Sequence, residues 1–356
     1  MRSSPKPRTP LARRNNFDAL RLLAAGAVIF SHAFLLATGE EAQEPLMRLT
    51  GGQAILGIVG VFVFFVISGY LVTQSWEETG SLARFAAKRA LRLYPALAAC
   101  LLVLTFGLGP AVTALAAADY FGDASTWDFL GWNLLLHTDH NLLPGVRFTE
   151  LGIGNIVDGP LWSLPVEVAM YAMVAALGLL RLIRLSVLAG LIALGLVCLW
   201  FDTTRYFEFI GSVGWMLGFF ATGMALFKLR EGGIVDGRLA LLALAALAAS
   251  VPLGAFIPMF PICGGYLTIY LALHPGIPAI PAARFGDLSY GLYIYGWPVE
   301  QTVLYLRPGT SPLTLFAIAL PVTAVLAFLS WHLLEKRALR LKPRRRGNPA
   351  LQAQAL

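Results

Sequence analysis

The sequence has few charged residues. Only 13% of its 356 residues are Asp, Glu, Lys or Arg, whereas 57% are hydrophobic, and the mean hydropathy is +0.69. Soluble globular domains carry about 25% charged residues, so this composition excludes that class of protein. Most of the surface of the folded chain is therefore expected to meet lipid.

Cysteine is also scarce. Cys100, Cys198 and Cys263 lie inside apolar runs, without the spacing of a disulfide framework or a zinc site. The pI near 9.5 comes from cations that stand between apolar segments, which is typical of topology signals rather than of a nucleic-acid-binding face. The segment His137-Thr138-Asp139-His140 is expected to be a solvated polar turn. We therefore expect no metal and no nucleic-acid partner.

Long apolar runs are abundant instead. Ten of them have about the length that crosses a bilayer, which predicts an all-α integral membrane protein with about ten transmembrane helices. The predicted segments are approximately 17–38, 54–74, 93–115, 160–180, 185–201, 211–228, 239–257, 260–277, 287–306 and 312–334.

The distribution of cations predicts the topology. Of 27 lysines and arginines, four fall in the alternate loops assigned to the outside, namely Arg48, Arg147, Arg205 and Arg307. The positive-inside rule then places both termini in the cytoplasm. We expect a basic N-terminus at 1–16, one membrane domain at 17–336 with an external loop at about 116–160, and a basic tail at 337–356. The basic start is expected to be retained rather than cleaved, and no soluble domain is expected at either end.

The first apolar segment contains two ionisable residues, Arg21 and His32. Eleven helical residues turn the chain about 20° past three full turns and span roughly 16 Å, so both side chains share one face. An ionisable group deep in a bilayer costs about 2.5 kcal/mol or more, which favours a functional role. The alternative for His32 is a core histidine that is hydrogen-bonded to a neighbouring helix.

A cationic patch precedes the third apolar segment. On a helix, Lys88, Arg89 and Arg92 occupy positions i, i+1 and i+4. Arginine forks bind phosphate oxygens in pairs, so the patch suits a phosphorylated ligand that arrives from the cytoplasm. Equally, these cations could serve only the topology and contact lipid head groups.

Six short motifs, in order from residue 17 to about 340, resemble the membrane acyltransferase-3 family. They are Phe17-Asp18-x-Leu20-Arg21 with His32; Phe64-Phe65-x-x-Ser68-Gly69-Tyr70; the Arg-x-x-Arg run that ends at Pro95; Leu161-Trp162-Ser163-Leu164-Pro165-Val166-Glu167 with Tyr171; Ser289-Tyr290-x-Leu292-Tyr293 with Trp297-Pro298; and Trp331-His332-x-x-Glu335-Lys336. Three positions depart from the family pattern: Gly296 replaces histidine, Val168-Ala169 replace Glu-Gln, and Arg337 replaces proline.

The resemblance implies transfer of an acyl group, most often acetyl, from cytoplasmic acyl-CoA to a hydroxyl of an extracytoplasmic carbohydrate or glycolipid. The products in that family are O-acylated polysaccharides, lipopolysaccharide sugars and glycolipids. The expected location is the inner membrane of a bacterium. In the expected donor site, Lys88, Arg89, Arg92 and Arg21 hold the phosphates of acetyl-CoA, and Tyr94 of the matched motif lies beside them.

His32 is the expected catalytic residue, because an alcohol needs a base and an imidazole titrates near neutrality. It would act either as the general base or as a transient acyl carrier. Glu167 is expected at the same depth, where it could orient the imidazole or bind the acceptor, although a helix dipole would also favour an acid there. Asp18 is expected to pair with Arg21, and Ser68 and Gly69 to allow a close helix approach.

Aromatic residues complete the predicted site. Tyr290, Tyr293 and Trp297 form one stripe, which core packing, an interfacial belt or sugar stacking could each explain. The expected acceptor contacts are Trp162, Ser163, Tyr293, Trp297 and Glu300.

Two other functions are compatible with parts of this pattern. A secondary transporter of a small anion or sugar would also carry Arg, His and Glu in its spans, but paired halves with interrupted helices are expected there. A non-catalytic lipid or glycan scaffold would not need a cation and an imidazole in axial register.

Overall fold

The computed structural model describes residues 15–151, 153–201 and 208–341. Helices are the only extended regular elements in these ranges, and the one β feature is an isolated bridge between Thr113 and Val146. The predicted all-α class is confirmed. Most of the basic N-terminus at 1–16, part of the tail at 337–356, and Arg205 lie outside the described residues.

Among the residues that the structure describes, six helical segments are long and apolar enough to cross a membrane by length and composition. They are Phe17–Thr38, Leu56–Thr79, Leu82–Val112, Gly159–Leu179, Phe209–Gly232 and Pro312–Leu341. Three shorter apolar helices are Leu185–Trp200, Gly237–Ser250 and Cys263–Leu273. Every predicted segment overlaps a helix of the structure, but ten membrane crossings and the cytoplasmic position of both termini remain predictions.

The main helices are α1 (Phe17–Thr38), α3 (Leu56–Thr79), α4 (Leu82–Val103), α8 (Ser163–Leu179), α9 (Leu185–Trp200), α10 (Glu208–Leu229), α11 (Gly237–Ser250), α13 (Cys263–Leu273), α14 (Ser289–Leu306) and α15 (Pro312–Ser330). Shorter helices are α2 (Pro45–Leu49), α5 (Gly109–Val112), α6 (Ala117–Gly122), α7 (Ala124–Leu134), α12 (Phe256–Met259) and α16 (Lys336–Ala338). Wider π-helical turns follow α4 at Leu104–Leu108 and α15 at Trp331–Glu335.

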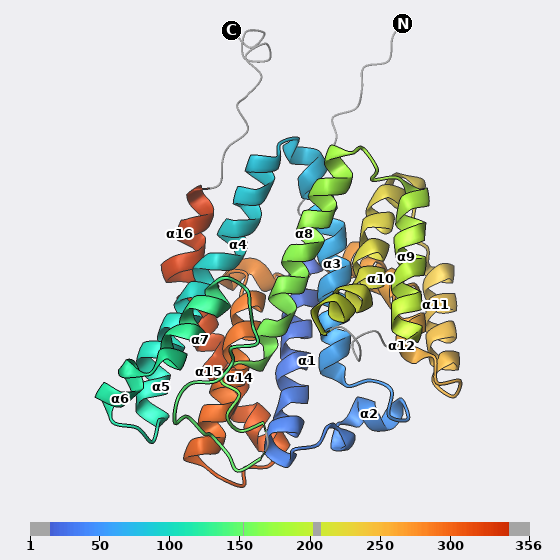
Figure 1. Cartoon of the computed structure of the whole chain (residues 1–356). Coiled ribbons are helices and arrows are strands. Elements are labelled where there is room, and N and C mark those ends of the chain that lie inside the picture. The colour runs from blue at the N-terminus through green and yellow to red at the C-terminus, as the bar shows by residue number, and fades with distance from the viewer. Residues whose placement is uncertain (1–14, 152, 202–207, 342–356) are drawn as a thin grey trace, which may run out of the picture.

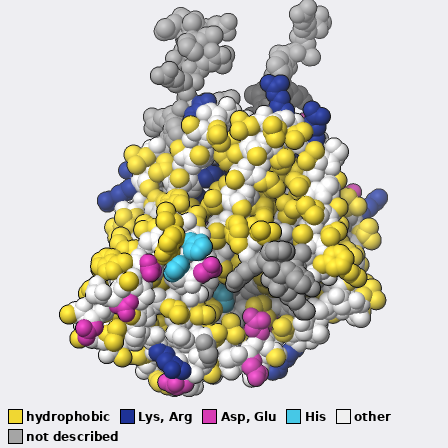
Figure 2. Space-filling view, in the orientation of Figure 1, with side chains coloured by type: hydrophobic (Ala, Val, Ile, Leu, Met, Phe, Trp, Pro, Cys, Tyr) yellow, Lys and Arg dark blue, Asp and Glu magenta, His cyan; other side chains and the backbone are white. Residues whose placement is uncertain are grey.

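The helices form one bundle in which α1 packs against α3, α14 and α15, and α10 packs against α3 and α9 (Figure 1). The turns after α3 and α8 lie at the upper end of this view, together with α16, whereas α2 and α6 lie at the lower end. Figure 2 shows a mostly hydrophobic face, with Lys and Arg mainly toward the upper end and most acidic side chains in the lower half. This pattern fits a bundle that crosses a bilayer with its more basic end on one side.

Helix α14 is the most enclosed element of the bundle. Every residue from Gly291 to Gln301 is buried, including the polar side chains Glu300 and Gln301. Helix α14 is not among the candidate spans selected by hydropathy. Its polar groups face other helices rather than lipid, as expected for ionisable groups in membrane bundles.

The third predicted segment begins too late. Helix α4 starts at Leu82, eleven residues before the predicted start at 93. The sequence here is rich in Ala, Leu and Arg, which are strong helix formers, so the helix continues through the charged patch. Arg89 and Arg92 therefore lie within a helix that enters the bundle rather than in a loop before it.

A crossing of α3 and α10 depends on small residues. A Cβ atom at Gly69 would lie 2.0 Å from the carbonyl oxygen of Phe220, and one at Gly223 would lie 2.0 Å from that of Val66. The two backbones are therefore in contact, as in small-residue packing of membrane helices. Ser68, beside Gly69, points instead toward α8, where its Oγ donates to Glu167 at 3.3 Å.

Candidate active site

A cavity of about 360 Å³ lies among α1, α3, α4, α8 and α14. Its charged side chains are Arg21, Arg89, Arg92, Glu167 and Asp287. Residues from the two ends of the sequence thus meet at one site. The concentration of ionisable groups in an otherwise apolar bundle marks this cavity as the candidate site.

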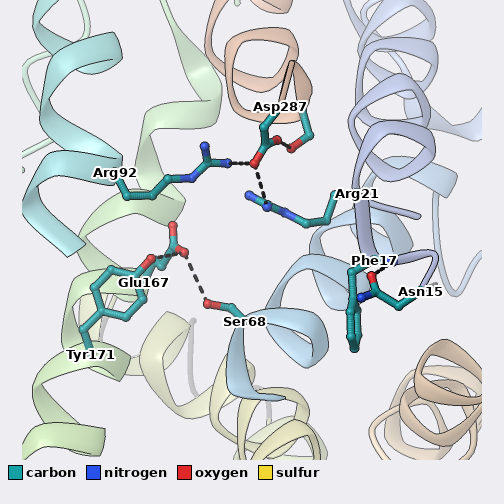
Figure 3. A network of polar contacts seen from close by, with 9 residues as sticks. Asn15, Phe17, Arg21, Ser68, Arg92, Glu167, Tyr171 and Asp287 are labelled. Atoms are coloured by element: carbon teal, nitrogen blue, oxygen red, sulfur yellow. Dashed lines mark hydrogen bonds and ion pairs between the residues drawn. The ribbon is translucent and has the colours of Figure 1, made fainter. Parts of the chain in front are cut away.

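Asp287 is the ionic centre of the cavity. Its Oδ2 atom lies 3.1 Å from Nη1 of Arg21 and 2.7 Å from Nη2 of Arg92 (Figure 3). Asp287 also accepts a hydrogen bond from Ser289 Oγ at 2.8 Å. Burial raises the pKa of Asp287, but the charges of Arg21 and Arg92 and the bonds from Ser289 outweigh it, so its pKa is lowered.

The turn before α14 places Asp287 between the arginines. Gly286 has φ of +106°, and a Cβ atom there would lie 2.2 Å from the Trp331 ring. Only glycine adopts this conformation readily in such close contact. The ninth predicted segment starts at residue 287, whereas α14 starts at Ser289, so Asp287 lies in the turn and its carboxylate reaches the cavity.

Arg21 was expected to pair with Asp18, and this expectation is wrong. The carboxylate that contacts Arg21 in the described part of the chain is that of Asp287. Asp18 is on the same helix, but a partner from the turn before α14 lies opposite the guanidinium. The ion pair therefore ties α1 to α14 rather than stabilising α1 alone.

Helix periodicity divides the predicted donor patch. Arg89 and Arg92 line the cavity, three residues apart on the face of α4 that points into the bundle. Lys88 is not among the lining residues, and its Nζ donates to Thr79 Oγ1 at 2.9 Å. Tyr94 is 40% exposed because two helical residues place it about 200° around α4 from Arg92. Neither Lys88 nor Tyr94 reaches the cavity in this conformation.

Arg89 differs from the other two arginines of the cavity. Within the described residues it has no ion pair, and its Nη2 donates to Ser75 Oγ at 3.4 Å. The guanidinium carbon lies 5.6 Å from the centroid of the Tyr171 ring, while the Nε atom is buried without a hydrogen-bond partner. Arg89 therefore retains donors for a further ligand.

Glu167 lies in this cavity and not beside His32. Its Oε1 accepts hydrogen bonds from Ser68 and Tyr171 (Figure 3). The predicted shared depth with His32 is wrong because α8 does not begin at the outer surface. The residues before it, including Asp158 and Leu161, are already buried inside the bundle.

This buried entry to α8 is bound to α14. Tyr293 hydroxyl lies 2.7 Å from Ser163 Oγ and 3.2 Å from the Pro160 carbonyl oxygen. One turn later, Trp297 Nε1 donates to the Ile156 carbonyl oxygen at 2.9 Å. The aromatic stripe is thus inside the protein, and an interfacial belt does not explain it. Tyr290 also faces inward, where its hydroxyl donates to the Leu93 carbonyl oxygen at 3.1 Å.

His32 lies outside the cavity lining, next to the part of α14 that follows Tyr293. Its ring meets the Trp297 ring edge to face at a centroid distance of 4.9 Å. Its Nδ1 atom is 4.0 Å from Oε2 of Glu300, which is completely buried. Arg21 and His32 therefore both face the region of α14, with Arg21 at the cavity and His32 beyond it. The carboxylate beside the imidazole is Glu300, not Glu167.

The remaining predicted acceptor contacts are divided between two environments. Ser163 and Tyr293 line the cavity, whereas Trp297 contacts His32. Trp162 is 37% exposed and is not among the lining residues, because it precedes Ser163 in a tight turn and points away.

Three acidic residues were missed by sequence reasoning. Asp287 stands two residues before the Ser289 motif, and Asp158 stands nine residues before Glu167. Glu335 belongs to the closing motif and accepts a hydrogen bond from Ser330 Oγ at 3.0 Å. A rare acid in an apolar sequence was the available signal, and Asp287 and Glu335 both lie near Arg92.

His137 and His140 lie on the exposed segment after α7. The His140 ring stacks against Trp132 at 5.5 Å, and Nε2 of His137 is 3.8 Å from Oδ2 of Asp139. Within the described residues, no group of three or more His, Cys, Asp or Glu side chains is arranged to hold a metal ion.

Comparison with known proteins matches residues 14–332 to the acyltransferase-3 family model, described as an acyltransferase domain. The chain belongs to this family. It is 30% identical to the O-acetyl transferase of Shigella phage Sf6, over 92% of this chain and 96% of the relative. It is also 30% identical to Nodulation protein 10 of Rhizobium leguminosarum bv. viciae, over 92% and 94% of the two chains.

A third relative is the putative membrane-bound transacylase BcsY of Komagataeibacter xylinus, with 25% identity over 93% of this chain and 84% of the relative. No solved structure gives a significant match to the chain. The family and the apolar helices together identify a multi-pass membrane acyltransferase.

Proposed function

We propose that this acyltransferase moves an acyl group, most simply acetyl, from cytoplasmic acyl-CoA to a hydroxyl of an extracytoplasmic carbohydrate. The acceptor would be an O-antigen, an exopolysaccharide or a glycolipid, and the location the inner membrane of a bacterium. Relatives named O-acetyl transferase and transacylase support this reaction class.

One observation carries the proposal. Arg21 and His32 lie on the same helix and both face α14, with Arg21 in a cavity that also contains Arg89 and Arg92. About 16 Å separates the two residues along α1. The phosphates and the thioester of coenzyme A stand at opposite ends of a long arm, so a cationic site at one level and an imidazole at the other match that molecule.

The arginines would bind the phosphates of the donor. Arg89 has no ion pair within the described residues and is the first contact expected. Arg21 and Arg92 are held by Asp287, so a phosphate must displace this carboxylate or share the arginines with it. A bound phosphate would replace one anion by another, which keeps the guanidinium groups compensated in a partly buried site.

The pantetheine arm would then extend past Tyr293 toward His32. Tyr293 lines the cavity, where its hydroxyl lies 2.7 Å from Ser163 Oγ. Trp297 lies one turn further along α14 and contacts the imidazole.

His32 would act as the general base. Its ring nitrogen would take the proton from the acceptor hydroxyl as the hydroxyl oxygen attacks the thioester carbonyl carbon. The carbon–sulfur bond breaks, and the imidazolium returns the proton to the sulfur of coenzyme A. In a two-step variant, the ring nitrogen first takes the acyl group and coenzyme A leaves as the thiolate. The acceptor hydroxyl then attacks the acyl-imidazole, the carbon–nitrogen bond breaks, and the hydroxyl proton passes through the released ring nitrogen to the thiolate.

Acyl transfer in membrane vesicles tests this function. Vesicles whose cytoplasmic side faces outward, given acetyl-CoA with a labelled acetyl group, should release free coenzyme A and label a glycan. His32→Ala should abolish labelling, whereas His274→Ala, which removes a histidine at the end of α13, should leave it unchanged. Label that reaches the vesicle lumen as a free small anion, with no labelled glycan, would favour transport and contradict the proposal.

A further inference from the structure

Glu300 and His32 form an isolated polar pair in the bundle. Glu300 is completely buried, and neither of its carboxylate oxygens has a hydrogen-bond partner in the described structure. The Nδ1 atom of His32 is also buried and unpartnered, 4.0 Å from Glu300 Oε2. Three buried polar atoms without hydrogen-bond partners therefore belong to two neighbouring side chains.

Such an arrangement is costly unless the atoms interact. A buried carboxylate without donors carries a desolvation penalty of several kcal/mol. The nearby donors bind elsewhere, because Gln301 Nε2 donates to the carbonyl oxygens of Ile153 and Ile156 and Trp297 Nε1 donates to that of Ile156. Compared with Gln301 and Trp297, His32 has an unpartnered ring nitrogen, and a small side-chain rotation would bring it within hydrogen-bond distance of Glu300.

We infer that Glu300 is the positioning residue of the proposed acyl transfer. Its carboxylate accepts a hydrogen bond from the Nδ1–H group of His32, which fixes one tautomer and leaves the lone pair on Nε2 for the reaction. The edge-to-face contact with Trp297 fixes the plane of the ring. This inference rests on the proposed role of His32 and replaces the predicted direct contact between Glu300 and the acceptor.

The pair divides the chemistry between the two ring nitrogens. Nε2 takes the proton of the acceptor hydroxyl while Nδ1 keeps its own proton toward Glu300. The resulting imidazolium lies beside the buried carboxylate of Glu300, so the positive charge is compensated. When the proton passes from Nε2 to the sulfur of coenzyme A, the original pair is restored.

Two substitutions at Glu300 test this role. Glu300→Gln keeps the shape and the oxygen acceptor but removes the charge, and we expect kcat to fall about 100-fold or more. Glu300→Asp retains the charge on a shorter side chain, and we expect it to recover at least about tenfold of that loss. The KM for acetyl-CoA should stay within about twofold in both variants, because Glu300 is distant from the arginines that would bind phosphate.

Glu44 supplies the matched control. It is also completely buried and lies beside Ser31, but its oxygens accept hydrogen bonds from the backbone N–H groups of Met47 and Leu56. Glu44→Gln should lower stability while leaving kcat per folded protein unchanged. Thermal stabilisation by coenzyme A verifies that each variant is folded and binds the donor.

A spectroscopic readout separates positioning from packing. In protein that retains His32 as its sole histidine, the ¹⁵N shifts should report a protonated Nδ1 and an unprotonated Nε2, and Glu300→Gln should populate the other tautomer. Wild-type kcat or an unchanged tautomer in Glu300→Gln would overturn the inference. If His32→Ala retains full activity, the proposed function itself fails, so the two failures are distinguishable.

Discussion

Replacement of Asp287 by asparagine is the sharpest perturbation of the cavity. Asp287→Asn removes the carboxylate shared by Arg21, at 3.1 Å, and Arg92, at 2.7 Å, but keeps the size of the side chain. Two guanidinium groups then face each other across the cavity without their common counter-ion. The protein should become less stable, and its affinity for phosphate should rise.

The magnitude follows from burial. Removing one partner of a buried ion pair costs about 3–5 kcal/mol. The side chains of Arg21, Arg92 and Asp287 are 20%, 16% and 19% exposed, so solvent relieves part of this penalty. We expect a loss of about 3 kcal/mol, the lower end of that range. If the variant binds coenzyme A tenfold more tightly, bound coenzyme A offsets about 1.4 kcal/mol of this lost stability.

Thermal unfolding in detergent provides the assay. Without ligand, the Tm of Asp287→Asn should be lower by roughly 6 °C. Saturating coenzyme A should raise the Tm of the variant more than that of the wild type, whereas pantetheine, which lacks phosphates, should not discriminate between them. Equal stabilisation of both proteins by coenzyme A would refute competition between Asp287 and the donor phosphates.

The Tm difference between wild type and Asp287→Asn should decrease at acidic pH. Because the pKa of Asp287 is lowered from 3.8 in the folded protein, its charge contributes full stability above 3.8. This contribution is lost as the pH falls below 3.8 and through the lower folded-state value. The Tm difference between wild type and Asp287→Asn should therefore be constant between pH 7 and 5 and shrink on further acidification. A difference that persists unchanged at pH 2.5 would contradict the ion-pair explanation.

Two further predictions concern donor binding and helix packing. Arg89→Lys keeps the charge but loses the planar fork, so it should raise the KM for acetyl-CoA about tenfold. Arg84 is not among the residues that line the cavity, and Arg84→Lys should leave this KM unchanged. Equal KM values for the two variants would exclude Arg89 as a phosphate ligand. Gly69→Ala would drive a Cβ atom against the Phe220 carbonyl oxygen, and it should destabilise the protein by at least about 2 kcal/mol in thermal unfolding. Gly26→Ala places its added carbon where no other atom lies within 4 Å, and it should be neutral or slightly stabilising. Similar Tm values for the two variants would contradict the close α3–α10 contact.

Spacing within one helix was the most informative part of the sequence. The separation of eleven positions between Arg21 and His32 predicted a shared face, and both side chains do face the α14 region. Helix periodicity also places Tyr94 about 200° around α4 from Arg92, away from the cavity. Motif membership, rather than helix geometry, brought Tyr94 into the predicted donor site.

Contacts between distant helices could not be predicted in this way. Arg21 and Asp287 are 266 residues apart, and no local rule connects them. Asp18 was an obvious partner because it is close in sequence, but the fold supplies a different carboxylate. The pairing of His32 with Glu300 was missed for the same reason, since it depends on how α14 is placed against α1.

The depth of Glu167 differs from the prediction because the segment before α8 does not end at the surface of the bundle. The residues before α8 instead enter the bundle, where Tyr293 binds the Pro160 carbonyl oxygen and Trp297 binds that of Ile156. Hydrophobicity along the chain does not reveal such an entry, because a buried loop satisfies its polar groups through particular side chains of another helix.

Acyl transfer by His32→Ala tests the central claim most directly. In vesicles loaded with the acceptor glycan and given labelled acetyl-CoA at the cytoplasmic face, the account predicts that wild-type protein labels the glycan. It predicts that His32→Ala gives only background labelling while coenzyme A still raises its Tm as in the wild type. Wild-type rates of labelling by His32→Ala would contradict the account.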